Sequence, residues 1–208
     1  MMIIFLMFHF FAGVGQTALQ NSFTYSPGGW SDGNNTAQFV ASGVTGAKAN
    51  YVYDNLQLTR ITYLPSEITS VIRLNGQLSN AELLPSEQLG AGGTDSVRGY
   101  DPRAASASQG ILASLELRSP TYSPLKQLDI GIEDNGQLLV FYDSGFIAYL
   151  HDQTGVAKSA SLQSVGFGAR YSIGRYFDVK FDYGWQLAKA PSASSMGHLA
   201  TLSVTLAY

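Results

Sequence analysis

The sequence predicts an all-β protein, an antiparallel transmembrane β-barrel portion of about eight strands. Apolar and polar residues alternate with a period of two along most of the chain, and helical periodicity is scarce. Long and very short links alternate between these segments, as they do in outer-membrane barrels. Charged residues make up only 13% of the 208 residues, about half the usual ~25%, although apolar residues reach 45%. These proportions suggest a surface that does not face water everywhere.

Eight segments carry the alternation. In the clearest, residues 177–187, the odd positions from Phe177 to Leu187 are apolar or aromatic, and the even ones are charged, polar or glycine. The others lie at residues 16–25, 47–64, 68–79, 109–119, 136–147, 161–173 and 201–208. Within 47–64 the phase changes near Asp54 and Asn55, which we interpret as a β-bulge.

The links between these segments indicate how the barrel lies in a membrane. Four are long and rich in Gly, Ser and Asn: 26–46, 80–108, 148–160 and 188–197. Residues 65–67 and 174–175 form tight turns, and 120–135 is a longer exception among the short links. Since short turns face the periplasm in such barrels, we expect the 80–108 loop to project from, or fold back into, the extracellular mouth. A soluble β-sandwich or lipocalin-like barrel is the alternative fold.

The apolar segment 1–15 is set apart from the barrel domain, which we assign to residues 16–208. It is interrupted by His9 and lacks the positive region of a secretory signal. It is therefore either the stump of an upstream element or a weak signal peptide.

Composition and motifs argue against several functions. The net charge of −3 and the absence of a Lys/Arg cluster argue against nucleic-acid binding. The chain has no cysteine, and its three histidines, His9, His151 and His198, are far apart, so we expect no metal site. It has neither a Gly-x-Ser-x-Gly nor a Walker motif, so we expect no catalytic residue, no cofactor and no enzyme activity.

Three ordered motifs carry a resemblance to a known family. Residues 83–103, LLPSEQLGAGGTDSVRGYDPR, contain the core Val97-Arg98-Gly99-Tyr100. Residues 115–120 read LELRSP, and Phe141-Tyr142-Asp143-Ser144-Gly145 has the form Phe-x-Asp-x-Gly. Together these resemble the hemolysin-activator family of two-partner-secretion transporters, within the superfamily of bacterial outer-membrane barrel-assembly proteins. The resemblance runs from about residue 20 to the C-terminus.

The resemblance implies a pore in the bacterial outer membrane that translocates a secreted hemolysin- or adhesin-like partner protein. Members have periplasmic POTRA domains followed by a sixteen-stranded barrel, and this chain matches the C-terminal half. We therefore expect a truncated form, in contact with outer-membrane lipid and completed by a missing N-terminal half or by a second copy. The alternatives are an assembly or insertion factor of the same superfamily and a surface adhesin without a pore.

The motifs also suggest how the 80–108 loop is held. An arginine inside the lumen needs a partner, because an unpaired charge removed from water is costly. Asp143 and Glu116 each alternate with apolar neighbours and so share the polar face, where they could pair with Arg98. Gly99 would allow close backbone approach or positive φ, and Tyr100 would add an aromatic anchor. Otherwise Arg98 is a solvated loop charge and Asp143 an ordinary lumen carboxylate. We expect these residues to line the path: Asp143, Glu116, Arg118, Arg170, Asp178, Lys180 and Asp182.

Overall fold

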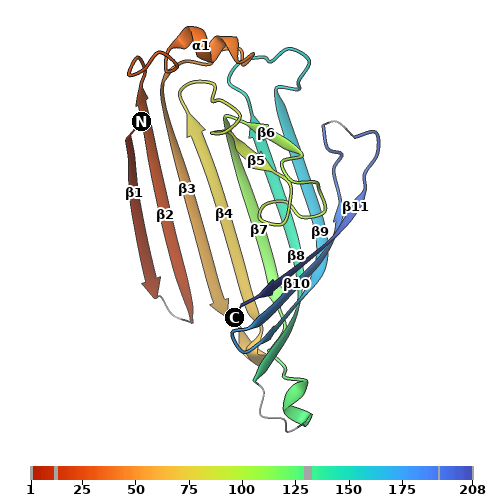
Figure 1. Cartoon of the computed structure of the whole chain (residues 1–208). Coiled ribbons are helices and arrows are strands. Elements are labelled where there is room, and N and C mark those ends of the chain that lie inside the picture. Colours follow the sequence, from red (N-terminus) through yellow and green to blue (C-terminus); the bar gives the residue numbers. More distant parts are fainter. Residues whose placement is uncertain (1, 12–13, 129–132, 192, 208) are drawn as a thin grey trace.

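A computed structural model of the chain shows a curved antiparallel sheet of nine strands, with a short hairpin against its concave face (Figure 1). It describes residues 2–11, 14–128, 133–191 and 193–207. The order of strands is β1-β2-β3-β4-β7-β8-β9-β10-β11, and every pair is antiparallel. The predicted all-β, antiparallel class is therefore confirmed. In this chain the sheet ends at β1 on one side and β11 on the other.

The strand bounds lie close to those predicted. The nine strands are β1 (Met2–Phe11), β2 (Gly15–Pro27), β3 (Asn50–Tyr63), β4 (Thr69–Ser79), β7 (Gln109–Arg118), β8 (Asp134–Ala148), β9 (Ser159–Ile173), β10 (Phe177–Gln186) and β11 (His198–Leu206). Tyr208, on which the last predicted strand ends, lies outside the described residues, as does part of the 120–135 link.

The structure differs from the alternation in two details. Besides the eight predicted strands, Met2–Phe11 pairs with β2 along its whole length and forms a ninth. The predicted bulge near Asp54 and Asn55 is absent, since both residues pair in unbroken register with β2 on one side and β4 on the other. The apparent change of phase in the apolar–polar alternation comes from side-chain type and not from the backbone, because polar residues occur on both faces of β3.

The period-two pattern separates an outer from an inner face. Along β8 the side chains of Leu139, Phe141, Asp143 and Ile147 are buried, and the alternate positions Leu138, Val140, Tyr142 and Phe146 are exposed. The exposed, outward positions of the central strands are large and apolar: Ile111, Leu115, Leu117, Leu138, Val140, Tyr142, Phe146, Val165 and Phe167. Such a continuous apolar outer face is what a lipid-facing sheet requires. Among the described residues, no helix combines the length and apolar character that a bilayer span needs.

The links alternate between the two ends of the sheet as predicted. The long ones leave the upper end in Figure 1, where the 28–49 link carries the short helix α1 (Thr36–Ala41). This stretch was expected to be loop. Asn35 caps the helix by accepting a hydrogen bond from the Gln38 amide at 3.0 Å. The 3₁₀ turns η1 (Pro65–Glu67) and η2 (Leu125–Leu128) belong to links at the lower end.

The 80–108 loop folds onto the concave face. Its strands β5 (Leu89–Ala91) and β6 (Ala105–Ala107) pair with each other and pack against β7 and β8. The hairpin and the wall share one apolar cluster: Leu89, Ala91, Val97, Tyr100, Ala107, Leu112, Ile147 and Leu162. Of the two placements that the sequence left open, the loop therefore adopts the inward one.

Neighbouring positions on β3 test the two faces. Leu56 is 44% exposed on the outer face, and Gln57 next to it lines the inner cavity. We expect Leu56→Arg to weaken folding into lipid vesicles by about 2–4 kcal/mol if the site is near the bilayer centre, and Gln57→Arg to have little effect. Equilibrium unfolding in vesicles measures both. Equal effects, or a wild-type chain that is folded and monodisperse in plain buffer, would contradict a lipid-facing outer surface.

Candidate functional site

The arginine of the loop motif lies at the innermost bend of the hairpin, between β5 and β6. Gly92, Gly93 and Gly99 around it all have positive φ, between 86° and 108°, a region that favours glycine. At Gly92 a Cβ would come within 2.4 Å of the Asp101 carbonyl oxygen. The glycines therefore allow the tight folding that carries the Arg98 side chain to the wall.

Arg98 binds Asp143 by both side chain and backbone. Its Nε and Nη2 donate to the two carboxylate oxygens of Asp143 at 2.7 and 2.8 Å, and its amide donates to one of them at 3.0 Å. Asp143 is fully buried and Arg98 is 5% exposed. A bidentate pair of this kind defines orientation as well as distance.

Arg98 has further partners on β7 and on β8, the strand that carries Asp143. Nη1 donates to Glu116 at 2.7 Å, and Nη2 lies 3.2 Å from the Ser114 hydroxyl. The guanidinium carbon sits 3.6 Å from the centre of the Phe141 ring. In the register of β7 and β8, Ser114 pairs with Asp143, and Glu116 pairs with Phe141. Two cross-strand pairs on the inner face, separated by the outward-facing pair of Leu115 and Tyr142, thus bind the Arg98 side chain.

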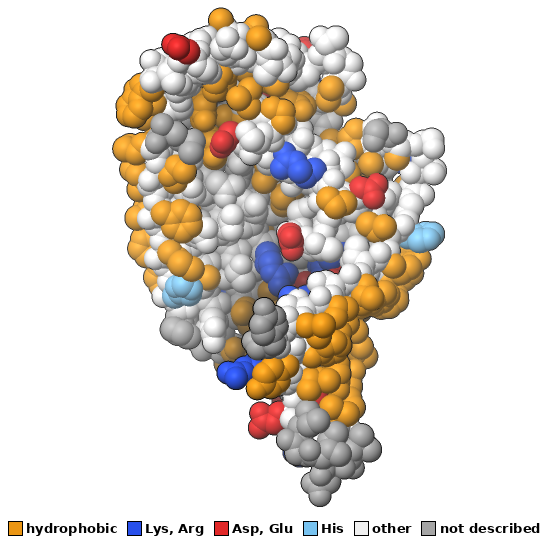
Figure 2. All heavy atoms as spheres, in the orientation of Figure 1, with side chains coloured by type: hydrophobic (Ala, Val, Ile, Leu, Met, Phe, Trp, Pro, Cys, Tyr) orange, Lys and Arg blue, Asp and Glu red, His pale blue; other side chains and the backbone are white. Residues whose placement is uncertain are grey.

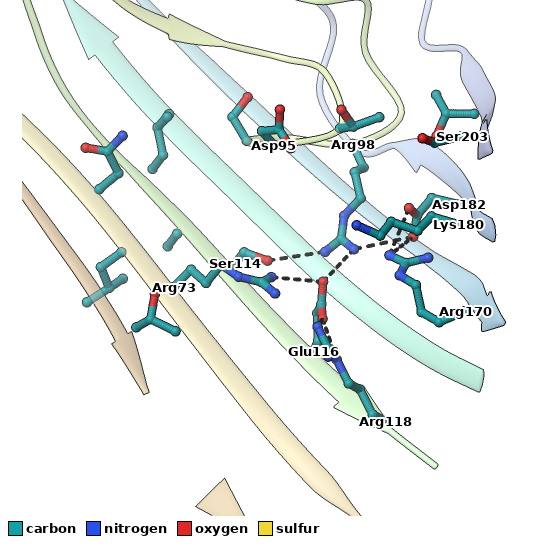
Figure 3. A pocket seen from close by; sticks show the side chains of 18 of the residues that line it. Arg73, Asp95, Arg98, Ser114, Glu116, Arg118, Arg170, Lys180, Asp182 and Ser203 are labelled. Atoms are coloured by element: carbon teal, nitrogen blue, oxygen red, sulfur yellow. Dashed lines mark hydrogen bonds and ion pairs between the residues drawn. The ribbon is translucent and has the colours of Figure 1, made fainter. Parts of the chain in front are cut away.

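Three further arginines surround this centre, as Figure 3 shows. Arg73 and Arg118 both bind Glu116, at 3.0 and 2.6 Å. Arg170 binds both oxygens of Asp182 at 2.9 Å, and Asp182 lies 3.5 Å from Arg98. We call this set, Arg73, Arg98, Arg118, Arg170, Glu116, Asp143 and Asp182, the Arg98 network. It connects the loop to β4, β7, β8, β9 and β10.

Charge complementarity keeps the loop arginine ionised. Burial by itself would lower the pKa of Arg98, but the hydrogen bonds and charge of Asp143, with the charges of Glu116 and Asp182, raise it above its usual value. Arg98 therefore stays a cation throughout the pH range in which proteins are folded.

The residues after Arg98 dock onto β10. Gly99 lies so close to Gly184 that a Cβ on Gly184 would be 2.8 Å from the Gly99 Cα. The Gln186 side-chain amide donates to the Gly99 carbonyl at 2.8 Å. The Tyr100 hydroxyl lies 2.8 Å from the carbonyl of Gln163 and 2.5 Å from that of Ala188. The motif therefore meets the last strands through its backbone and its tyrosine.

Glycines in the wall make room for the aromatic ring and the loop. A Cβ on Gly166, which pairs with Phe141 across β8 and β9, would lie 2.4 Å from that ring. On Gly145 it would lie 3.0 Å from the Val97 side chain. The Phe-x-Asp-x-Gly strand thus supplies three different things: a ring beneath Arg98, its carboxylate partner, and space for Val97.

Many residues of this site were predicted from the sequence, and others are revealed only by the structure. The structure brings Val97, Arg98, Gly99, Tyr100, Glu116, Phe141, Asp143 and Gly145 to one place. Asp182 was expected to line the path, but not to lie against Arg98. Gly184 and Gln186 were not singled out, although the glycines on the polar face of 161–173 and 177–187 were a readable sign of close backbone approach.

An open cavity of about 810 Å³ lies beside the network. Of the expected path residues, Glu116, Arg118, Arg170, Asp178, Lys180 and Asp182 line it, whereas Asp143 is covered by the loop. Figure 2 shows the charged side chains gathered in this hollow, with apolar ones over the strands at its rim. The loop therefore covers Asp143, while Arg98 and Glu116 border the open polar cavity.

Comparison with known proteins decides the family. Residues 11–171 match the model of the haemolysin secretion/activation proteins ShlB/FhaC/HecB, a span that contains all three motifs. The chain belongs to this family. Its members are outer-membrane secretion proteins rather than enzymes, and membership places the chain in the bacterial outer membrane.

Curated relatives agree with this assignment. The chain is 30% identical over 129 residues to the heme/hemopexin transporter protein HuxB of Haemophilus influenzae strain 86-028NP, and equally to that of strain ATCC 51907. The match covers 60% of this chain and 22% of HuxB. The chain thus spans about a fifth of the length of the curated relatives it matches.

The contact between Gly99 and Gly184 provides a test of loop docking. We expect Gly184→Ala to lift the loop from the wall, since the new methyl group has no room, and to speed tryptic cleavage after Arg98 and Arg103 about tenfold. Gly76→Ala is the matched control, because a Cβ there meets only the Gly110 carbonyl oxygen at 3.9 Å. Mass spectrometry of the peptides locates the cuts. Unchanged protection in Gly184→Ala would show that the contact is not needed for docking.

Proposed function

We propose that this chain is the loop-bearing part of an outer-membrane pore that translocates a secreted partner protein of the hemolysin or adhesin type. Membership in the haemolysin secretion/activation family supports the class of function. Beyond β1 and β11, where the sheet ends, further strands from an N-terminal half of the barrel or from a second copy would complete the pore wall.

The observation that carries the proposal is the Arg98 network. Arg98 binds Asp143 and Glu116 on a wall whose outer side is apolar, so the loop occupies the polar interior of the sheet. A side chain that serves only solubility would lie in water, whereas this one is 5% exposed. We propose that Arg98, Asp143 and Glu116 hold the loop in the lumen, with Val97, Gly99, Tyr100, Phe141 and Gly145 shaping the contact.

The network suits a reversible contact. Buried ion pairs contribute little net stability, since desolvation of each ion costs several kcal/mol and offsets their attraction. Glu116 keeps Arg73 and Arg118 as partners, and Asp182 keeps Arg170, if Arg98 withdraws. Only Asp143 would depend on water for its charge, and departure of the loop exposes it to the cavity. The loop can therefore leave without stranding a charge.

The cavity surface suits an unfolded polypeptide. Its lining mixes cations, carboxylates, hydroxyls and amides, with few large apolar side chains exposed toward the interior. Such a surface offers many weak, exchangeable hydrogen bonds to a passing backbone and few strong ones. The substrate would cross as an extended or hairpin-like chain without nucleotide or other cofactor.

A double-mutant cycle in a full-length homologue tests the Arg98–Asp143 pair. We expect Arg98→Ala and Asp143→Ala each to reduce the partner protein in the medium about tenfold or more, because removing either side disrupts the buried pair. The double variant should lose little more, since both substitutions break one unit. Quantitative immunoblotting of the medium measures secretion.

Arg175→Ala, at an exposed arginine of the β9–β10 turn, is the matched control and should leave secretion unchanged. The amount of folded protein in the outer membrane is measured in parallel, so that a secretion defect is separated from an assembly defect. Small, additive effects of the two substitutions would show that the pair does not act as a unit.

A further inference from the structure

The 80–108 loop contains a buried carboxylate of its own, Glu82, away from the Arg98 network. Glu82 is fully buried where the loop leaves β4, and none of the three motifs contains it. Its Oε2 accepts a hydrogen bond from the hydroxyl of Ser108, which is also fully buried, at the other end of the loop. Glu82 therefore joins the two ends of the 80–108 segment at their base.

Glu82 also contacts two other long links, 28–49 and 149–158, at the same end of the sheet. Its Oε1 accepts the backbone amide hydrogen of His151, in the 149–158 link, at 2.6 Å. Its own backbone forms a parallel bridge with Ala47, in the 28–49 link. One buried side chain and its peptide group thus touch three links that are far apart in the sequence.

Further contacts join the two flanking links to each other. The Thr45 amide donates to the Gln153 side-chain oxygen at 2.9 Å, and the Gln153 side-chain nitrogen donates back to the Thr45 carbonyl at 2.9 Å. The His151 ring packs against Gly46, where a Cβ would lie 2.7 Å from Nδ1. Gly46 has a φ of +84°, so two independent constraints favour glycine here.

We propose that Glu82 is a positioning residue that fastens the base of the lumen loop and the two flanking links into one rigid assembly, independently of the Arg98 network. A hydroxyl and a peptide amide satisfy one oxygen each of its carboxylate, as burial of such a group requires. The tip of the loop can then leave the wall while its base stays in place. The loop moves as a hinged arm, and the two flanking links keep their positions.

The absence of cysteine in the chain allows a direct test. Nitroxide labels are placed at Val40→Cys and Val156→Cys, two exposed positions on the flanking links, and their distance distribution is measured by pulsed electron resonance on the 208-residue chain in lipid nanodiscs. We expect Glu82→Ala to broaden the distribution about twofold, because the three links lose their shared contact. Glu82→Gln, which keeps an acceptor for the His151 amide, should restore most of the narrow distribution.

Two controls separate this role from general destabilisation and from the proposed translocation. Asp101→Ala removes an exposed carboxylate of the same loop, and Arg98→Ala releases the tip; both should leave the distribution narrow. An unchanged distribution in Glu82→Ala would overturn the proposal, as would equal broadening in Arg98→Ala. Circular dichroism verifies that each variant retains its sheet. Because no partner protein is involved, the result does not depend on whether the chain takes part in secretion.

Discussion

The structure depends on one buried cation. Arg98 is removed from water at the tip of a loop, and its charge can be carried there only because Asp143, Glu116 and Asp182 are aimed at it from three strands. Each carboxylate is placed by the register of its strand, and two of the three are shared with arginines of the wall. A shift of one residue in β7, β8 or β10 would turn a carboxylate to the apolar outer face. Pairing with Arg98 therefore favours one register of these strands. That register in turn determines where the loop binds the wall.

Backbone proximity is the second requirement, and glycine meets it on both sides. Gly99 in the loop faces Gly184 in β10, and Gly166 leaves room for the Phe141 ring beneath the guanidinium. Side chains at these positions would hold the loop away from the wall by more than a hydrogen bond can span. Polar complementarity alone would then fail, because bidentate pairing needs its atoms within about 3 Å. The low net stability of buried ion pairs makes such a contact specific without making it permanent.

The loop is anchored at two levels with different chemistry. At its tip, charges meet charges, and each wall carboxylate except Asp143 keeps another arginine when the tip leaves. At its base, Glu82 is bound by a hydroxyl and a peptide amide that belong to the loop itself and to its neighbouring link. A contact shared with the wall suits exchange, while one made within the links suits permanence. Under the proposed function, this division would let the interior clear while the links at the other end of the loop stay ordered.

Alternation in the sequence determined much of this protein: the antiparallel all-β class, eight of the nine strands to within a few residues, and the faces on which Asp143 and Glu116 lie. The resemblance of the 83–103, 115–120 and 141–145 motifs supplied the family. The pairing expected of Arg98 followed from the cost of an unpaired buried charge and from the polar phase of Asp143 and Glu116. Period two could not reveal β1, whose residues are apolar on both faces, nor the hairpin strands β5 and β6, which are three residues each. Nor could it exclude a bulge at Asp54, because a change in polarity and a change in register look the same in one strand.

Only the tertiary structure decided that Asp182 joins Arg98, that Gly184 receives Gly99, and that Glu82 contacts two other links. These contacts join segments tens of residues apart, and their distances are set by how neighbouring strands align rather than by any local pattern.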